Sequence, residues 1–83
     1  MKAELPKLSM LKVILTLEER GEPISEILRR TNLNANCFYE IIEYLMKMGL
    51  VEDERVKRTR KVYLTSRGME IKKMLLDVFS QLS

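Results

Sequence analysis

The chain has 83 residues, of which 46% are apolar and 33% are charged, and its formal net charge is +3. We expect one small globular domain whose core alone gives only marginal stability, so a partner subunit is also expected. The longest apolar run is too short to cross a bilayer, which argues against a membrane-spanning protein.

The first predicted helix runs from Leu5 to Arg20, with Pro6 in its first turn and Gly21 just past its end. It has apolar residues on two sides, and a helix of that kind is normally sandwiched between two surfaces. One side should therefore face the core and the other a second subunit. The first stripe consists of Leu8, Leu11 and Leu15. We assign dimer contact to the second stripe, which consists of Met10, Val13, Ile14 and Leu17.

Residues 25–48 predict two helices joined by a short turn. Ser25 is placed to cap the first helix, SEILRR, and Asn34 to cap the second, ANCFYEIIEYLMKM, because their side-chain oxygens can accept free backbone N–H groups. Gly49 should end the second helix. The apolar face of that helix consists of Phe38, Ile41, Ile42 and Leu45.

Residues 50–65 predict a β-hairpin, and residues 66–82 a final helix capped by Thr65 or Ser66. The tip of the hairpin, RVKRTRK, contains five basic residues and no acid. The final helix has an apolar stripe wider than a small core requires, which again indicates a dimer. Its members assigned to dimer contact are Met74, Leu75, Val78, Phe79 and Leu82.

The order of elements predicts a mainly α fold with a small β-hairpin (α+β): helix, short helix, turn, helix, hairpin, helix. The stretch ISEILRRTNLNANCFYEIIEYLMKMGLVE resembles the helix-turn-helix of small archaeal winged helix-turn-helix DNA-binding proteins. VYLTSRGMEI is similar to the Y-x-L-T-x-x-G ending that follows the wing in such regulators, with one residue missing between Tyr63 and Leu64. The resemblance covers about residues 8–82 and implies a single winged-helix domain, residues 1–83, of the transcription-regulator type.

The second helix of the motif, residues 34–48, is the expected recognition helix, because an α-helix fits the major groove and presents its N-terminal half to the bases. Asn36 suits adenine, and Glu40 or Glu43 could accept a bond from cytosine N4. The alternative for the two glutamates is a solvated face beside Lys47. The candidate readers are Asn34, Ala35, Asn36, Tyr39, Glu40 and Glu43.

The basic hairpin tip is expected to contact phosphates or an adjacent minor groove, which would provide affinity and register rather than sequence preference. The alternative is a charged turn that keeps the hairpin soluble and protects its edges. The candidate residues are Arg55, Lys57, Arg58, Arg60 and Lys61.

The leading hypothesis is a dimeric transcription regulator that binds double-stranded DNA sequence-specifically. The alternatives are an architectural, chromatin-like DNA-binding protein with little sequence preference, and a winged-helix protein-interaction module. The chain has no histidine, no Gly-rich phosphate loop and no nucleophile motif, so we predict no enzyme activity, cofactor, metal or small-molecule ligand.

The start MKAELPK lacks a secretory signal, and the single cysteine, Cys37, agrees with a reducing compartment. We therefore expect an intracellular protein, in the cytoplasm and associated with the nucleoid.

Overall fold

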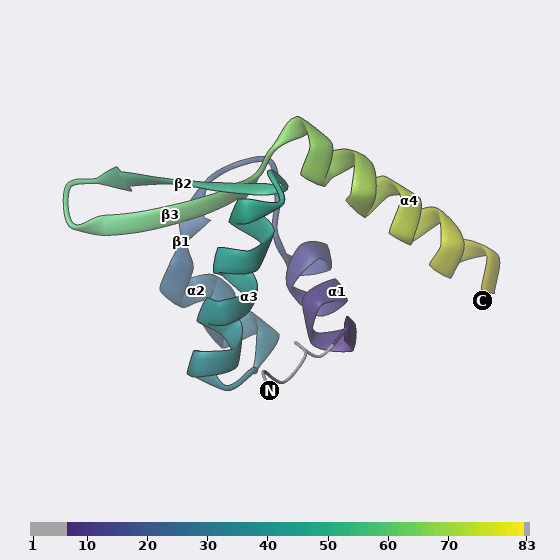
Figure 1. Cartoon of the computed structure of the whole chain (residues 1–83), viewed down its shortest axis with the longest axis horizontal. Helices are drawn as coiled ribbons and strands as arrows, with labels where there is room; N and C mark the ends of the chain where they lie inside the picture. The colour runs from purple at the N-terminus through teal and green to yellow at the C-terminus, as the bar shows by residue number, and fades with distance from the viewer. Residues whose placement is uncertain (1–6, 83) are drawn as a thin grey trace.

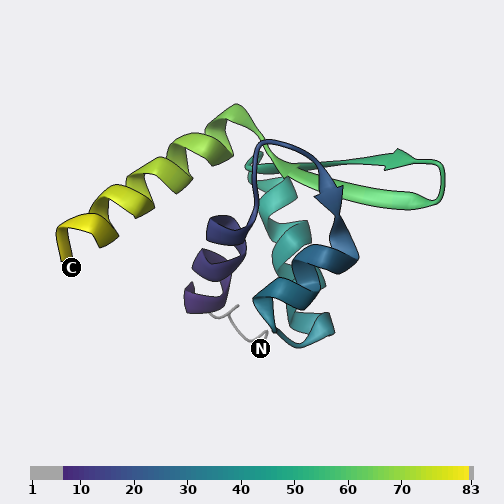
Figure 2. The ribbon, with the colours of Figure 1, turned by 180° about the vertical axis from the view of Figure 1, so that it is seen from behind.

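The computed structural model describes residues 7–82 and shows four helices and a three-stranded antiparallel sheet (Figure 1). The elements are α1 (Lys7–Thr16), β1 (Glu22–Pro23), α2 (Ile24–Thr31), α3 (Ala35–Lys47), β2 (Val51–Val56), β3 (Thr59–Leu64) and α4 (Ser66–Leu82). The β2–β3 hairpin projects from one side of the α1–α3 bundle, and α4 extends from the other side (Figures 1 and 2). This arrangement confirms the predicted winged-helix fold. Within residues 7–82, no helix has the length and apolar character needed to cross a membrane.

The core lies where α1, α2, α3 and the base of the hairpin meet. Its buried apolar side chains are Val13, Ile14, Leu17, Ile24, Ile27, Phe38, Ile41, Ile42, Leu45, Leu50, Val51, Val62 and Leu64. The assignment of Val13, Ile14 and Leu17 to a dimer contact is therefore wrong. These side chains already pack inside their own chain, and the outward stripe of α1 is the one that begins at Leu8. Helical periodicity identified both stripes but could not show which neighbour covers each.

Helix α1 ends at Thr16, four residues before the predicted end at Arg20, and Leu5 and Pro6 lie outside the described residues. The following segment is held by contacts distant in sequence: Leu64 N–H donates to Glu18 O over 2.8 Å. Strand β1 then pairs with β3, and Pro23 favours an extended conformation for the residue before it. This third strand was not predicted, because its two residues carry no periodic pattern.

Three of the five predicted caps and stops agree with the structure, and Gly21 is not one of them because α1 already ends at Thr16. Asn34 caps α3, Gly49 follows that helix with φ +77°, and Thr65 Oγ1 accepts from Gly68 N–H over 3.1 Å at the start of α4. Ser25 does not cap α2. That helix begins at Ile24, and its N-cap residue Pro23 makes no side-chain capping bond.

The start of α4 packs directly on the backbone that leads into β2. A Cβ atom added to Gly68 would lie 2.1 Å from Leu50 O, so only glycine allows this approach. The same carbonyl accepts from Thr65 N–H over 3.0 Å. The helix is therefore anchored at its first turns, while residues 76–82 are exposed.

Candidate nucleic-acid interface

Helix α3 buries one face and exposes the other. Phe38, Ile41, Ile42 and Leu45 pack into the core, which turns the opposite face of the helix to solvent. The predicted readers Ala35, Asn36, Tyr39, Glu40 and Glu43 are all exposed. The helical spacing therefore placed this set correctly on the accessible side of α3.

Two of the predicted readers also have local roles. Asn34 Oδ1 accepts from Asn36 N–H over 2.9 Å and from Cys37 N–H over 3.4 Å, so this oxygen is engaged in capping the helix. The Tyr39 ring lies edge-on to Phe38, with 5.4 Å between ring centroids. Tyr39 therefore contacts a core side chain while remaining exposed.

The hairpin formed by β2 and β3 has two chemically different faces, because directly paired residues lie on the same side of an antiparallel sheet. Asp53 pairs with the buried Val62, and Arg55 pairs with Arg60, on the inner face. Glu54 pairs with Lys61 on the outer face. The five cations of the hairpin are thus divided between two faces and the tip.

Arg60 is held by groups of its own chain. Its Nε donates to Asp53 Oδ2 over 2.8 Å, and its guanidinium also donates to Met46 Sδ of α3 over 3.7 Å. The side chain is only 29% exposed. Arg60 therefore braces the hairpin against α3, and its charge is largely compensated before any ligand arrives.

The tip carries the freest positive charge of the hairpin. Arg55, Lys57 and Arg58 are exposed, and none of them has an ion pair with another residue of the described range 7–82. Lys57 has φ +58°, which the two-residue turn between β2 and β3 imposes. Lys61 is half-buried along β3. The cationic tip therefore consists of Arg55, Lys57 and Arg58.

On the outer face, Tyr63 Oη donates to Glu52 Oε1 over 3.1 Å. This hydrogen bond raises the pKa of Tyr63 above its ordinary value. The acidic residues at the base of the hairpin are thus partly engaged within the sheet.

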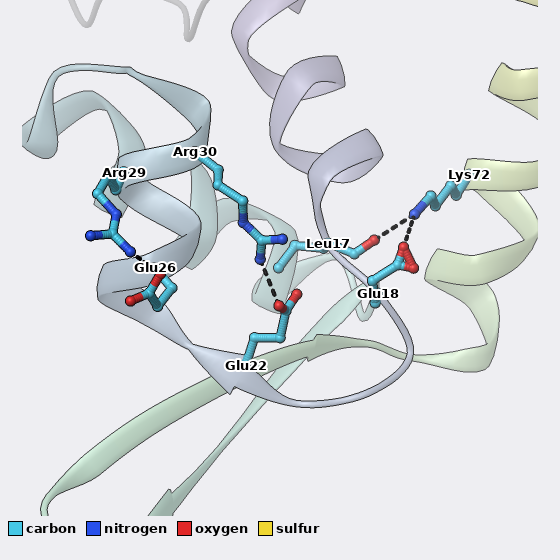
Figure 3. Close-up of polar contacts among 7 residues, drawn as sticks. All are labelled: Leu17, Glu18, Glu22, Glu26, Arg29, Arg30 and Lys72. Carbon is cyan, nitrogen blue, oxygen red and sulfur yellow. Dashed lines mark hydrogen bonds and ion pairs between the residues drawn. The ribbon is translucent and has the colours of Figure 1, made fainter.

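Two arginines at the end of α2 are also paired, as Figure 3 shows. Arg29 bonds to Glu26 in the same helix, and Arg30 bonds to Glu22 of β1 over 2.7 Å. Both pairs are partly exposed. Both arginines therefore bind carboxylates of their own chain, at the end of a helix where positive charge is favourable.

Lys72 is a buried cation of α4. Its Nζ donates to Leu17 O and to Glu18 Oε1, both over 2.8 Å, and links α4 to the end of α1 (Figure 3). The hydrogen bond and positive charge of Lys72 lower the pKa of Glu18 below its ordinary value. Within residues 7–82, no three His, Cys, Asp or Glu side chains lie close enough together to bind a metal ion.

A protein-family model for winged helix-turn-helix domains matches residues 7–82. The chain belongs to the winged helix-turn-helix family. No curated protein matches it in sequence. Membership confirms the family resemblance predicted from the motif and the hairpin ending, while an archaeal origin stays a prediction.

Solved structures with the same fold share little sequence with this winged-helix chain. AF1382 from Archaeoglobus fulgidus has a TM-score of 0.84 at 21% identity, covering 95% of this chain and 92% of its own. The PcaV transcriptional regulator from Streptomyces coelicolor has a TM-score of 0.80 at 21% identity, covering 98% of this chain and 60% of its own. A mutant of S. aureus MepR bound to an oligodeoxyribonucleotide has a TM-score of 0.79 at 12% identity, covering 89% of this chain and 58% of its own. At these identities the likeness establishes the fold.

Proposed function

We propose that the chain is a dimeric transcription regulator that binds double-stranded DNA sequence-specifically. The observation that carries this proposal is the exposed polar face of α3 beside a hairpin whose tip holds three exposed cations. In this arrangement α3 enters the major groove and the tip contacts the phosphate backbone or the adjacent minor groove. Asn36, Tyr39, Glu40 and Glu43 are the base-reading side chains, with Asn34 and Ala35 at the helix start.

The cationic tip supplies the sequence-independent part of the affinity. Arg55, Lys57 and Arg58 are exposed, so they can contact phosphates without first breaking an ion pair. Arg60 keeps the hairpin on α3 through Asp53 and Met46, and Lys61 contributes from the side of β3. Only the three tip residues are therefore counted as full phosphate contacts.

Two structures with the same fold support the proposal. One is described as a transcriptional regulator, and another is bound to an oligodeoxyribonucleotide. Both have longer chains than this one. These neighbours support a DNA-binding function rather than an enzymatic one. Binding to the chromosome would place the protein in the cytoplasm with the nucleoid.

Dimerisation is proposed through the last helix together with the outer side of the first. On α4, Met74, Val78 and Leu82 are exposed apolar side chains along one side of the helix, beside Leu75 and Phe79. On α1, Met10 is half-buried and Leu8 is exposed. A small domain with this much exposed apolar surface gains stability by covering it with a second copy. A twofold dimer would present its two α3 helices about 34 Å apart.

The proposal is tested by selecting bound sequences from a randomised duplex pool at near-physiological salt. We expect enrichment of a palindrome and an apparent binding constant that falls with a log-log salt slope of about −3 per subunit, from about −0.9 per phosphate contact. A triple variant, Arg55→Ala, Lys57→Ala and Arg58→Ala, should bind the same motif more weakly and with a shallower slope. The matched control removes three exposed cations elsewhere, with Lys12→Ala, Arg67→Ala and Lys73→Ala.

The outcomes separate the three candidate functions. Binding without enrichment of any motif would indicate an architectural protein, and no duplex binding would favour a protein-interaction module. Light scattering tests the dimer: Val78→Glu with Leu82→Glu should yield monomers, whereas Leu76→Glu, an exposed position on the other side of α4, should not. A wild-type chain that is monomeric at micromolar concentration would contradict the dimer.

A further inference from the structure

We propose that Glu40 and Glu43 select cytosine in the major groove by accepting hydrogen bonds from its N4 amino group. This inference rests on the proposed function, because it concerns how α3 selects its DNA. The two glutamates are specificity-determining residues of the surface formed by α3 and the hairpin. The acidic pair is not a separate site.

The two glutamates occupy the positions that a groove-reading helix uses. Both are exposed on the face opposite Phe38, Ile41 and Ile42. They are three residues apart on α3, which separates them by about 4.5 Å along the helix axis at about 1.5 Å per residue. Successive base pairs are about 3.4 Å apart. The pair can therefore address neighbouring base pairs from one helix face.

Both carboxylates lack a partner within the described residues 7–82. No ion pair or hydrogen bond joins Glu40 or Glu43 to another side chain, and Lys47, one turn after Glu43, does not bridge to it. Glu18, by contrast, is engaged by Lys72. Two uncompensated negative charges on a face that meets a polyanion cost affinity unless each finds a donor.

The cations of the hairpin do not supply that donor. Arg60, the hairpin cation that touches α3, is already bound to Asp53 and reaches Met46. The tip cations lie at the far end of β2 and β3 (Figure 1). The surface therefore has positive charge at the hairpin tip, where it attracts phosphates, and negative charge on α3. In the proposed complex, the bases that α3 faces supply these donors.

The hydrogen-bonding groups that each base presents in the major groove identify cytosine as the partner of the two carboxylates. In the major groove guanine presents two acceptors, thymine presents one acceptor and a methyl group, and adenine presents an acceptor beside its amino donor. Cytosine alone presents an amino donor with no acceptor on its own edge. A carboxylate is therefore attracted to cytosine and repelled by the acceptors of the other bases. Asn36, whose amide both donates and accepts, suits adenine instead.

The rival reading, in which both glutamates form a solvated face, predicts effects of the opposite sign. Replacing a solvated carboxylate near DNA with alanine removes repulsion and tightens binding to every duplex. Replacing a carboxylate that binds cytosine removes a contact, which weakens binding to the selected site and abolishes the preference at one position. The sign of the change in affinity thus decides between the two readings.

The experiment measures dissociation constants of the wild-type chain, Glu40→Ala and Glu43→Ala for the duplex selected by the wild type. A second series of duplexes replaces each cytosine of the motif with thymine, or with a cytosine analogue that lacks the N4 amino group. We expect each variant to lose about 5- to 150-fold in affinity for the selected duplex, the range of one good base contact. Each variant should also become indifferent to the analogue at one position. Alanine favours the helix, so folding is retained.

Glu70→Ala is the matched control, because it removes an exposed carboxylate from α4, away from the α3 surface. It should leave the preference at every position unchanged. Tighter binding of both α3 variants to all duplexes, or a selected motif without cytosine, would overturn this inference while leaving the proposed function intact. The result for Glu40→Ala tests the role of Glu40 alone, and the result for Glu43→Ala tests the role of Glu43 alone. Failure of the wild-type chain to bind any duplex would overturn the proposed function itself.

Discussion

Helices α1 and α4 both carry more apolar residues than one small core needs, and they use them differently. In α1 the stripe that includes Val13 and Ile14 is buried within the chain. In α4 the side chains of Met74, Val78 and Leu82 remain 60%, 52% and 77% exposed. Amphipathic periodicity therefore shows that a face favours burial, but the path of the chain decides what covers it. Helix α1 lies against α2 and α3, whereas α4 leaves the body after its first turns (Figures 1 and 2).

The largest expected effect comes from comparing two leucine-to-alanine variants, one at a buried leucine next to α1 and one at an exposed leucine on α4. Leu17 is 0% exposed, so Leu17→Ala should lower the free energy of unfolding by about 2–5 kcal/mol through lost burial and a residual cavity. Leu76, at 50% exposure, lies off the apolar stripe, and Leu76→Ala should change it by less than about 0.5 kcal/mol. Urea unfolding followed by circular dichroism measures both. Equal losses would contradict the difference between the two helices.

Lys72 joins the two helices and provides the next test. Its Nζ is bound to Leu17 O and Glu18 Oε1, and the residue is 8% exposed. Lys72→Met keeps most of the apolar side chain but leaves the Leu17 carbonyl without this donor. We expect a loss of roughly 1.5–3 kcal/mol in the free energy of unfolding, typical of hydrogen bonds that involve a charged group. The adjacent exposed Lys73 is the control, and an equally large loss for Lys73→Met would refute the structural role of Lys72.

The parts of the fold that the sequence predicted depend on local signals. The helix of α3 follows from the capping side chain of Asn34, a four-residue apolar face and a glycine at position 49, all close together in the chain. The exposed readers follow from the same periodicity. In β3, Val62 and Leu64 alternate with more polar residues and are buried on one face, which is the local pattern of a half-buried strand.

The features that the sequence did not predict depend on tertiary contacts and on strand register. Lys72 lies 54 residues from Glu18, and α4 has to dock on the segment after α1 before the two meet. The division of the hairpin cations depends on strand register, which places Arg60 beside Asp53 and leaves Arg55 free. Composition identified a basic segment, but only the pairing of β2 with β3 shows which of its cations bind groups of their own chain and which do not.

The smallest expected effect is a pH dependence of the link between α1 and α4. The hydrogen bond from Lys72, with its positive charge, lowers the pKa of Glu18 in the folded chain below the ordinary value of 4.5. A carboxyl with a lowered folded pKa adds stability above its unfolded pKa, and loses it as the pH falls through the folded pKa. Because half of the Glu18 side chain is exposed, solvent screening should limit this contribution to less than about 1 kcal/mol. At pH 7 the wild-type chain should therefore have a larger free energy of unfolding than Glu18→Gln. This difference should shrink as the pH falls below about 4.5. Urea unfolding across pH 3–7 measures this gap, and a difference that persists unchanged into acid would show that the charge of Glu18 does not hold α4 to α1.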